Sequence, residues 1–167
     1  KLQDPEAEGE FFERFAVSGD PWCRASALEI LSTDNLNDRQ LGFVCSWAGQ
    51  DDNPYVRRYA QVLVQNAARS SDLAFRTAVA LCDVAATVGE RSRMLGAVCE
   101  RPTSREATER LDQALRVPMD PEYTRMATRL VIGHKLSAPS VMEAVRGLLI
   151  HPEPELRLAA IQALGIL

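Results

Sequence analysis

The sequence PELRLAAIQALG at residues 154–165 carries the pattern that decides the predicted fold. It begins with proline and an acidic residue, continues to Arg157, and reaches the small residue Ala160 three positions later. Large aliphatic residues follow at three- and four-residue spacing, which is typical of a helix that buries one face. Proline suits the first turn of a helix, because the N–H groups of that turn have no acceptor within the helix. The stretch therefore predicts a helix over residues 153–167.

The same phrase recurs along the chain, in the order of a turn, an arginine, a small residue and large aliphatic residues. The arginines of successive copies are separated by 32 to 36 residues, a period that is typical of helical solenoids. The third copy is degenerate, because it lacks the turn proline and aspartate and has Gly89 and Glu90 in their place. The structural repeat arginines are Arg24, Arg57, Arg93, Arg125 and Arg157.

Apolar residues between these phrases also recur at helical spacing, and they predict a second helix in every repeat. The chain shows no strand-like alternation, so the predicted fold class is all-α, with about five antiparallel helix pairs. The first helices of the pairs are predicted at residues 5–17, 36–49, 71–87, 104–116 and 138–150. The second helices are predicted at residues 21–32, 54–68, 90–100, 121–135 and 153–167.

The phrases at residues 154–165 and 52–60 resemble the second helix of a HEAT repeat. The resemblance covers most of the chain and is poorest in the third repeat. It implies a right-handed α-solenoid in which helix pairs stack on one another, with residues 1–167 as a single HEAT-like domain. It also implies a surface that binds other macromolecules, although the architecture alone does not specify a function. Residues 159–167 are almost entirely apolar, and one interpretation is that the chain is a fragment of a longer protein.

Each repeat arginine falls in the first turn of its helix, where the helix dipole disfavours a cation. The arginine therefore needs an acceptor outside its own helix. We expect it to bind the turn aspartate or a carbonyl group of an adjacent repeat, which would form a ladder of charge-assisted hydrogen bonds. The alternative is a solvated side chain with no fixed partner.

The composition excludes several classes of protein. Of the 167 residues, 46% are hydrophobic and 25% are charged, so the chain is too apolar to be disordered. The net charge of −4 argues against a nucleic-acid binder, which needs surplus lysine and arginine. The apolar runs are shorter than the ~18 residues that a membrane span needs. We therefore expect no nucleic-acid partner and no membrane span.

The cysteines lie in apolar helical stretches, and none belongs to a CxxC pair. The favoured interpretation is reduced core thiols in a cytoplasmic protein, and the alternatives are a disulfide pair or a metal site. The four cysteines are Cys23, Cys45, Cys82 and Cys99.

The sequence contains no recognisable motif for catalysis. It has no nucleophile elbow and no glycine-rich phosphate loop, and neither His134 nor His151 has a metal-ligand neighbour at helical spacing. Asp51 and Asp52 are interpreted as capping and turn residues. We therefore predict no catalytic residue, no cofactor, no metal site and no enzymatic activity.

The two tryptophans are predicted to differ. Trp47 lies on an apolar stripe near the end of its helix and is expected in the core. Trp22 directly follows the turn proline, and its place at the rim leaves both a core and a surface role open.

Helix geometry predicts one candidate binding surface. The positions one, two and five residues after each repeat arginine should face away from the core, toward the concave side. Exposed methionine, tyrosine and leucine in a row would fit a helix or peptide of a partner. The alternative is a displaced helix phase, which would place several of these residues in the core. The partner-binding candidates are Arg58, Tyr59, Val62, Met94, Leu95, Met126, Leu130 and Leu158.

These features favour a non-catalytic protein–protein interaction scaffold that binds a partner protein or peptide through its concave helix face. A regulatory or structural domain of a larger protein, in contact with flanking domains of the same chain, is the alternative. A HEAT-like enzyme of the bilin lyase or alkyl-base DNA glycosylase type is less favoured. The glycosylase type requires a basic concave face, whereas this chain is acidic.

Overall fold

The structure of the protein is a computed structural model that describes residues 5–31, 36–116 and 120–166. These residues form ten α-helices and one short 3-10 helix and contain no strand, which confirms the predicted all-α class. None of the helices in this described part of the chain combines the length and the apolar character needed to cross a membrane.

The chain divides into two compact units, an N-terminal unit (residues 1–77) and a C-terminal unit (residues 78–167). The boundary falls within α5 (Asp72–Val84), so each unit contains part of this helix.

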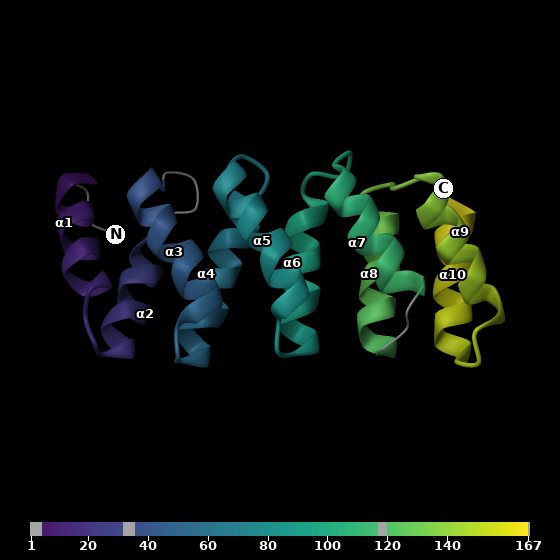
Figure 1. Cartoon of the computed structure of the whole chain (residues 1–167), viewed down its shortest axis with the longest axis horizontal. Helices are drawn as coiled ribbons and strands as arrows, with labels where there is room; N and C mark the ends of the chain where they lie inside the picture. Colours follow the sequence, from purple (N-terminus) through teal and green to yellow (C-terminus); the bar gives the residue numbers. More distant parts are fainter. Residues whose placement is uncertain (1–4, 32–35, 117–119, 167) are drawn as a thin grey trace. The chain divides into compact units, whose positions relative to one another are not determined.

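The N-terminal unit contains two helix pairs and the first part of α5. The pairs are α1 (Pro5–Ala16) with α2 (Pro21–Ile30), and α3 (Asp38–Gln50) with α4 (Pro54–Ala67). The helices of each pair pack against each other, and the second helices α2 and α4 also pack together (Figure 1). The beginnings of α2 and α4 are thereby brought close in space.

An aromatic cluster lies in the core of the N-terminal unit. The ring of Phe12 is fully buried, and its centroid lies 5.8 Å from that of Phe43 and 5.9 Å from that of Trp47. Tilted and edge-on contacts of this kind suit the charge distribution of aromatic rings. Trp47 keeps only 8% of its surface exposed, which confirms its predicted place in the core.

The C-terminal unit contains the end of α5 and all later helices. They are α6 (Val88–Cys99), α7 (Arg105–Arg116), α8 (Pro121–Gly133), α9 (Pro139–Gly147), the 3-10 helix η1 (Leu148–Ile150) and α10 (Pro154–Ile166). The second helices α6, α8 and α10 pack in succession, and α7 packs against α6, α8 and α9 (Figure 1). Each helix therefore buries its apolar face mainly against its nearest neighbours in the repeat.

Three second helices begin where the sequence predicts, because the same local chemistry starts them. The first position of α2, α4 and α8 is proline, which has no N–H to leave unpaired. The preceding residues Asp20, Asn53 and Asp120 accept hydrogen bonds from the free N–H groups of the first turn.

The third second helix, α6, begins differently. Thr87 and Glu90 form a capping box, in which each side chain accepts the backbone N–H of the other residue. This box starts the helix at Val88, two residues before the predicted start at residue 90. The register of the third repeat is consequently displaced from the predicted one.

The remaining predicted helices agree with the structure to within a few residues. The helix predicted at 138–150 is divided into α9 and η1. Residues 32 and 167, where two of the predicted second helices end, lie outside the described residues.

Candidate functional site

An arginine at the fourth position of a second helix binds the turn that precedes that helix. Arg57 Nη1 donates to the carbonyl oxygens of Asp51 at 2.6 Å and of Asp52 at 3.2 Å. Arg157 Nη1 donates to the carbonyls of His151 and Pro152, both at 2.7 Å. Carbonyl groups at the end of a helix have no N–H donor within that helix, so the arginine donates to them and offsets their partial negative charge.

These contacts correct part of the predicted ladder. The arginines have fixed acceptors, so the alternative of a solvated side chain is wrong for Arg57 and Arg157. However, these carbonyl acceptors lie five and six residues earlier, in the turn of the same helix pair. The arginine thus joins the two helices of one pair, and we call this arrangement the arginine clamp.

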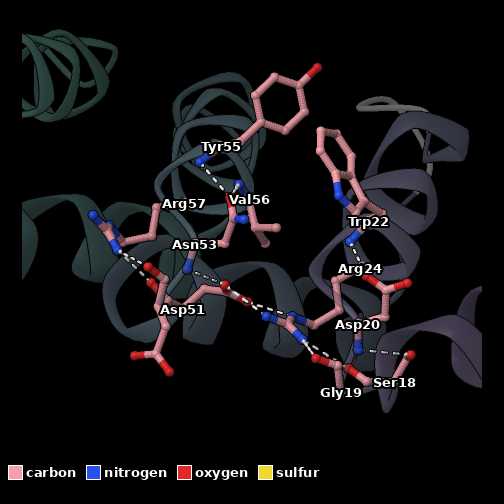
Figure 2. A network of polar contacts seen from close by, with 11 residues as sticks. Ser18, Gly19, Asp20, Trp22, Arg24, Asp51, Asn53, Tyr55, Val56 and Arg57 are labelled. Carbon is pink, nitrogen blue, oxygen red and sulfur yellow. Dashed lines mark hydrogen bonds and ion pairs between the residues drawn. The ribbon is translucent and has the colours of Figure 1, made fainter.

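Arg24 makes the same clamp and a second contact as well. Its Nη1 donates to the carbonyls of Ser18 at 2.9 Å and Gly19 at 3.1 Å. Its Nε and Nη2 donate to the carboxylate of Asp51 at 2.7 and 3.0 Å, a bidentate ion pair between neighbouring repeats (Figure 2). The predicted link between adjacent repeats is therefore present at this position.

Asp51 is the most constrained charged group in this network. Only 3% of its side chain is exposed, and its Oδ1 also accepts the backbone N–H of Asn53 at 2.9 Å. Burial by itself raises the pKa of the Asp51 carboxyl, but the hydrogen bonds from Arg24 and Asn53 outweigh burial and lower it below its usual value. The carboxylate is therefore charged at neutral pH and holds the starts of α2 and α4 in register.

In the third and fourth repeats the arginines differ from the prediction. The clamp of α6 is made by Arg91, whose Nη2 donates to the carbonyl of Ala85 at 3.3 Å. The fourth position of α8 is Thr124, and the following Arg125 forms an exposed ion pair with Glu155 of α10. Arg93 was predicted to be the third repeat arginine, and the displaced start of α6 explains the error.

The same displacement corrects two of the predicted partner-binding residues. Met94 and Leu95 are fully buried, so their predicted exposure is wrong. Met94 lies three positions after Arg91, where α2 and α4 have the buried residues Ala27 and Ala60.

The other candidates lie at the surface to different extents and belong to both units. Arg58, Val62 and Leu158 are exposed, whereas Tyr59, Met126 and Leu130 are half-buried. Binding of a partner by these residues stays a prediction.

The structure brings together three aromatic side chains at the surface of the N-terminal unit. Trp22 is 68% exposed and Tyr55 is 45% exposed, and their ring centroids lie 6.0 Å apart. The ring of Tyr59 follows at 5.3 Å from that of Tyr55. We call Trp22, Tyr55 and Tyr59 the aromatic row, and an exposed tryptophan in such a cluster is unusual for a surface with no partner.

The backbone positions of the row are fixed by the helix caps. Asp20 Oδ1 accepts the N–H of Trp22 at 2.9 Å, and Asn53 Oδ1 accepts the N–H of Tyr55 at 2.9 Å. Figure 2 shows the rings of Trp22 and Tyr55 side by side, on the opposite side of the helix starts from the Arg24–Asp51 pair. The clamp and the caps therefore fix the backbone positions from which the two rings project.

Sequence reasoning found only part of the row. It placed Tyr59 on the candidate surface and left Trp22 undecided, and it missed Tyr55. The available signal was that Trp22 and Tyr55 each directly follow the proline that starts their helices. The two positions are distant in the sequence, and only the packing of α2 against α4 brings their side chains together.

Acidic groups lie at both ends of the row. At the start of α2, the carboxylate of Asp20 accepts the backbone N–H of Trp22, the residue that carries the first ring. The pKa of the Tyr59 phenol is raised by the nearby Tyr55 and by the negative charge of Glu29. The row is thus an apolar, electron-rich surface with carboxylates at its edges, and such a surface favours cations.

The part of the chain that the structure describes contains no group of three histidine, cysteine or acidic residues able to hold a metal ion. All four cysteines are free thiols. Burial raises the pKa of Cys82 and of Cys99 to about 12, so both are protonated at neutral pH.

Comparison with known proteins adds no assignment. No protein-family model matches the chain, and no curated protein is significantly similar to it.

Proposed function

We propose that this protein is a non-catalytic interaction module that binds an extended segment of a partner protein through the aromatic row. Residues 1–167 would form a single HEAT-like α-solenoid, right-handed, and the succession of packed second helices within each unit supports this architecture. The observation that carries the proposal is the exposed pair of Trp22 and Tyr55. Tryptophan and tyrosine dominate the binding energy of many interfaces, because they bury a large area with little loss of side-chain freedom.

The spacing of the rings indicates the kind of segment that would bind. Successive centroids lie 6.0 and 5.3 Å apart, close to the ~6 Å that two residues span in a polyproline II helix. Proline-rich segments bind aromatic surfaces, because they are already extended and lose little entropy. The carboxylates of Asp20 and Glu29 favour lysine or arginine beside the prolines. We therefore propose a proline-rich, basic segment as the ligand.

Fluorescence of Trp22 provides the test. The chain has two tryptophans, and Trp47 is almost fully buried, so iodide should quench mainly Trp22. A synthetic proline-rich basic peptide is titrated into the full chain, with an alanine-substituted peptide of equal length and charge as the control ligand. We expect a blue shift of the emission and protection from iodide with the proline-rich peptide alone.

Variants locate the binding surface in the same assay. Tyr55→Ala and Tyr59→Ala keep Trp22 as the reporter and should each weaken binding about tenfold, since an interface anchor contributes roughly 1.4 kcal/mol or more. Val17→Ala is the matched control, because Val17 is an exposed apolar residue of the same unit outside the row. Equal affinity of the Tyr55, Tyr59 and Val17 variants, or no response of Trp22 to the peptide, would refute the proposal.

A further inference from the structure

The C-terminal unit contains a small cavity that the proposed function does not use. It has a volume of about 210 Å³ and lies among the end of α5, α6, α7 and α8. Most of its polar lining residues have side chains that can donate a hydrogen bond: Cys82, Arg91, Arg110, Gln113 and Tyr123. Asp83 is the single carboxylate among these lining residues.

Arg110 has an incomplete set of partners. Its Nη2 donates to Asp83 Oδ2 at 2.7 Å, which ties α7 to the end of α5. Its Nε is buried, and no residue in the described part of the chain accepts a hydrogen bond from it. Buried donors without an acceptor are rare in folded proteins, and an ion or ligand is one of the few ways to satisfy them. Arg110 Nε therefore lacks a hydrogen-bond acceptor.

A second guanidinium group faces the same cavity. Arg91 uses Nη2 to clamp the carbonyl of Ala85, and its guanidinium carbon lies 5.8 Å from the centroid of the Tyr123 ring. An arginine carries five N–H donors, so the clamp leaves Arg91 able to bind a further acceptor.

The charges that line the cavity do not cancel. Arg91 and Arg110 contribute two positive charges, and Asp83 contributes one negative charge. Burial raises the pKa of the Tyr123 phenol and of the Cys82 thiol, so both groups are neutral at pH 7. The lining therefore carries one net positive charge and, in Tyr123, a ring that can contact an apolar group.

We propose that this cavity binds a small organic oxyanion, with its anionic group between Arg110 Nε and the guanidinium of Arg91, and its organic part against the ring of Tyr123. A carboxylate and a phosphate can each offer two oxygens to an arginine in a bidentate pair. The site lies in the C-terminal unit alone, so it is independent of the aromatic row.

The test measures binding of three probes to the full chain: inorganic phosphate, phenyl phosphate and benzoate. Isothermal titration gives the affinities, and the ¹⁵N signal of Arg110 Nε reports contact at the atom in question. We expect saturable binding of at least one organic probe in 150 mM sodium chloride, with a shift of the Arg110 Nε signal. Stronger binding of phenyl phosphate or of benzoate distinguishes the phosphate ligand from the carboxylate ligand.

Variants separate a specific site from general attraction of anions. Arg110→Lys keeps the charge and loses the Nε donor, and Arg91→Gln loses the second cation; each should weaken binding about tenfold or more. Arg105→Gln is the matched control, because Arg105 lies exposed on the same helix and pairs with Glu109 outside the cavity. The proposal is overturned if no probe binds, if phosphate alone binds without moving the Arg110 signal, or if the Arg105 variant loses as much affinity as the Arg110 variant.

Discussion

The second position of the second helices differs between the two units. In the N-terminal unit it is occupied by Trp22 and Tyr55, and in the C-terminal unit by Gly89, Glu122 and Glu155. Corresponding positions at the helix starts therefore present rings in one unit and mostly carboxylates in the other. The two units therefore differ in the surface chemistry that they present at this position of the repeat.

The units also differ in how neighbouring repeats are joined. Arg24 and Asp51 form a bidentate ion pair that is almost fully buried on the carboxylate side. Arg125 and Glu155 connect α8 to α10 through side chains that are largely exposed. Water and salt screen the exposed pair, so it contributes much less to stability than its geometry suggests.

The largest effect is expected at the displaced third repeat. Met94→Ala would restore the small residue found in α2 and α4, but it would leave a cavity in the core of the C-terminal unit. We expect the free energy of unfolding to fall by about 2 to 4 kcal/mol. Urea unfolding measures it, with Leu158→Ala at an exposed position of α10 as the control. A change no larger than that of the control would contradict the register described for α6.

The next prediction compares the stability that is lost when each of the two ion pairs is removed. Asp51→Ala leaves Arg24 without its buried partner and removes the cap of the Asn53 N–H, so a loss of about 3 kcal/mol is expected. Glu155→Ala should cost less than about 1 kcal/mol, because its pair with Arg125 is exposed. Equal losses in urea unfolding would show that burial does not distinguish the two links.

The smallest expected effect is the change with pH in the stability that Asp51 contributes. The pKa of Asp51 is lower in the folded protein than the ~3.9 of an unfolded chain, so its charge stabilises the fold fully above about pH 5. This contribution is lost as the pH falls through the lowered folded value. The difference in unfolding free energy between the natural chain and Asp51→Asn should therefore shrink between pH 5 and the lowest pH at which the protein folds. A difference that stays constant with pH would mean that Asp51 is not the titrating group.

Local signals in the sequence predict most of the helices. Proline with a preceding Asp or Asn marks the starts of α2, α4 and α8, since these residues act on N–H groups within the same turn. The error at α6 also has a local cause: Thr87 and Glu90 form a capping box that starts the helix at Val88, whereas the period of the repeat predicts a start at residue 90. The wrong exposure of Met94 and Leu95 follows from this one displacement.

By itself the sequence determined the all-α class, most of the helix starts and the need of the repeat arginines for acceptors, because each depends on residues within two turns. Only the tertiary structure decided which side chains meet from distant positions. Trp22 reaches Tyr55, and Arg24 reaches Asp51, only because α2 packs on α4; Arg110 and Asp83, 27 residues apart, likewise meet only where α7 approaches the end of α5. The physical reason is that helix period and capping act over a few residues, whereas such contacts depend on how whole helices pack.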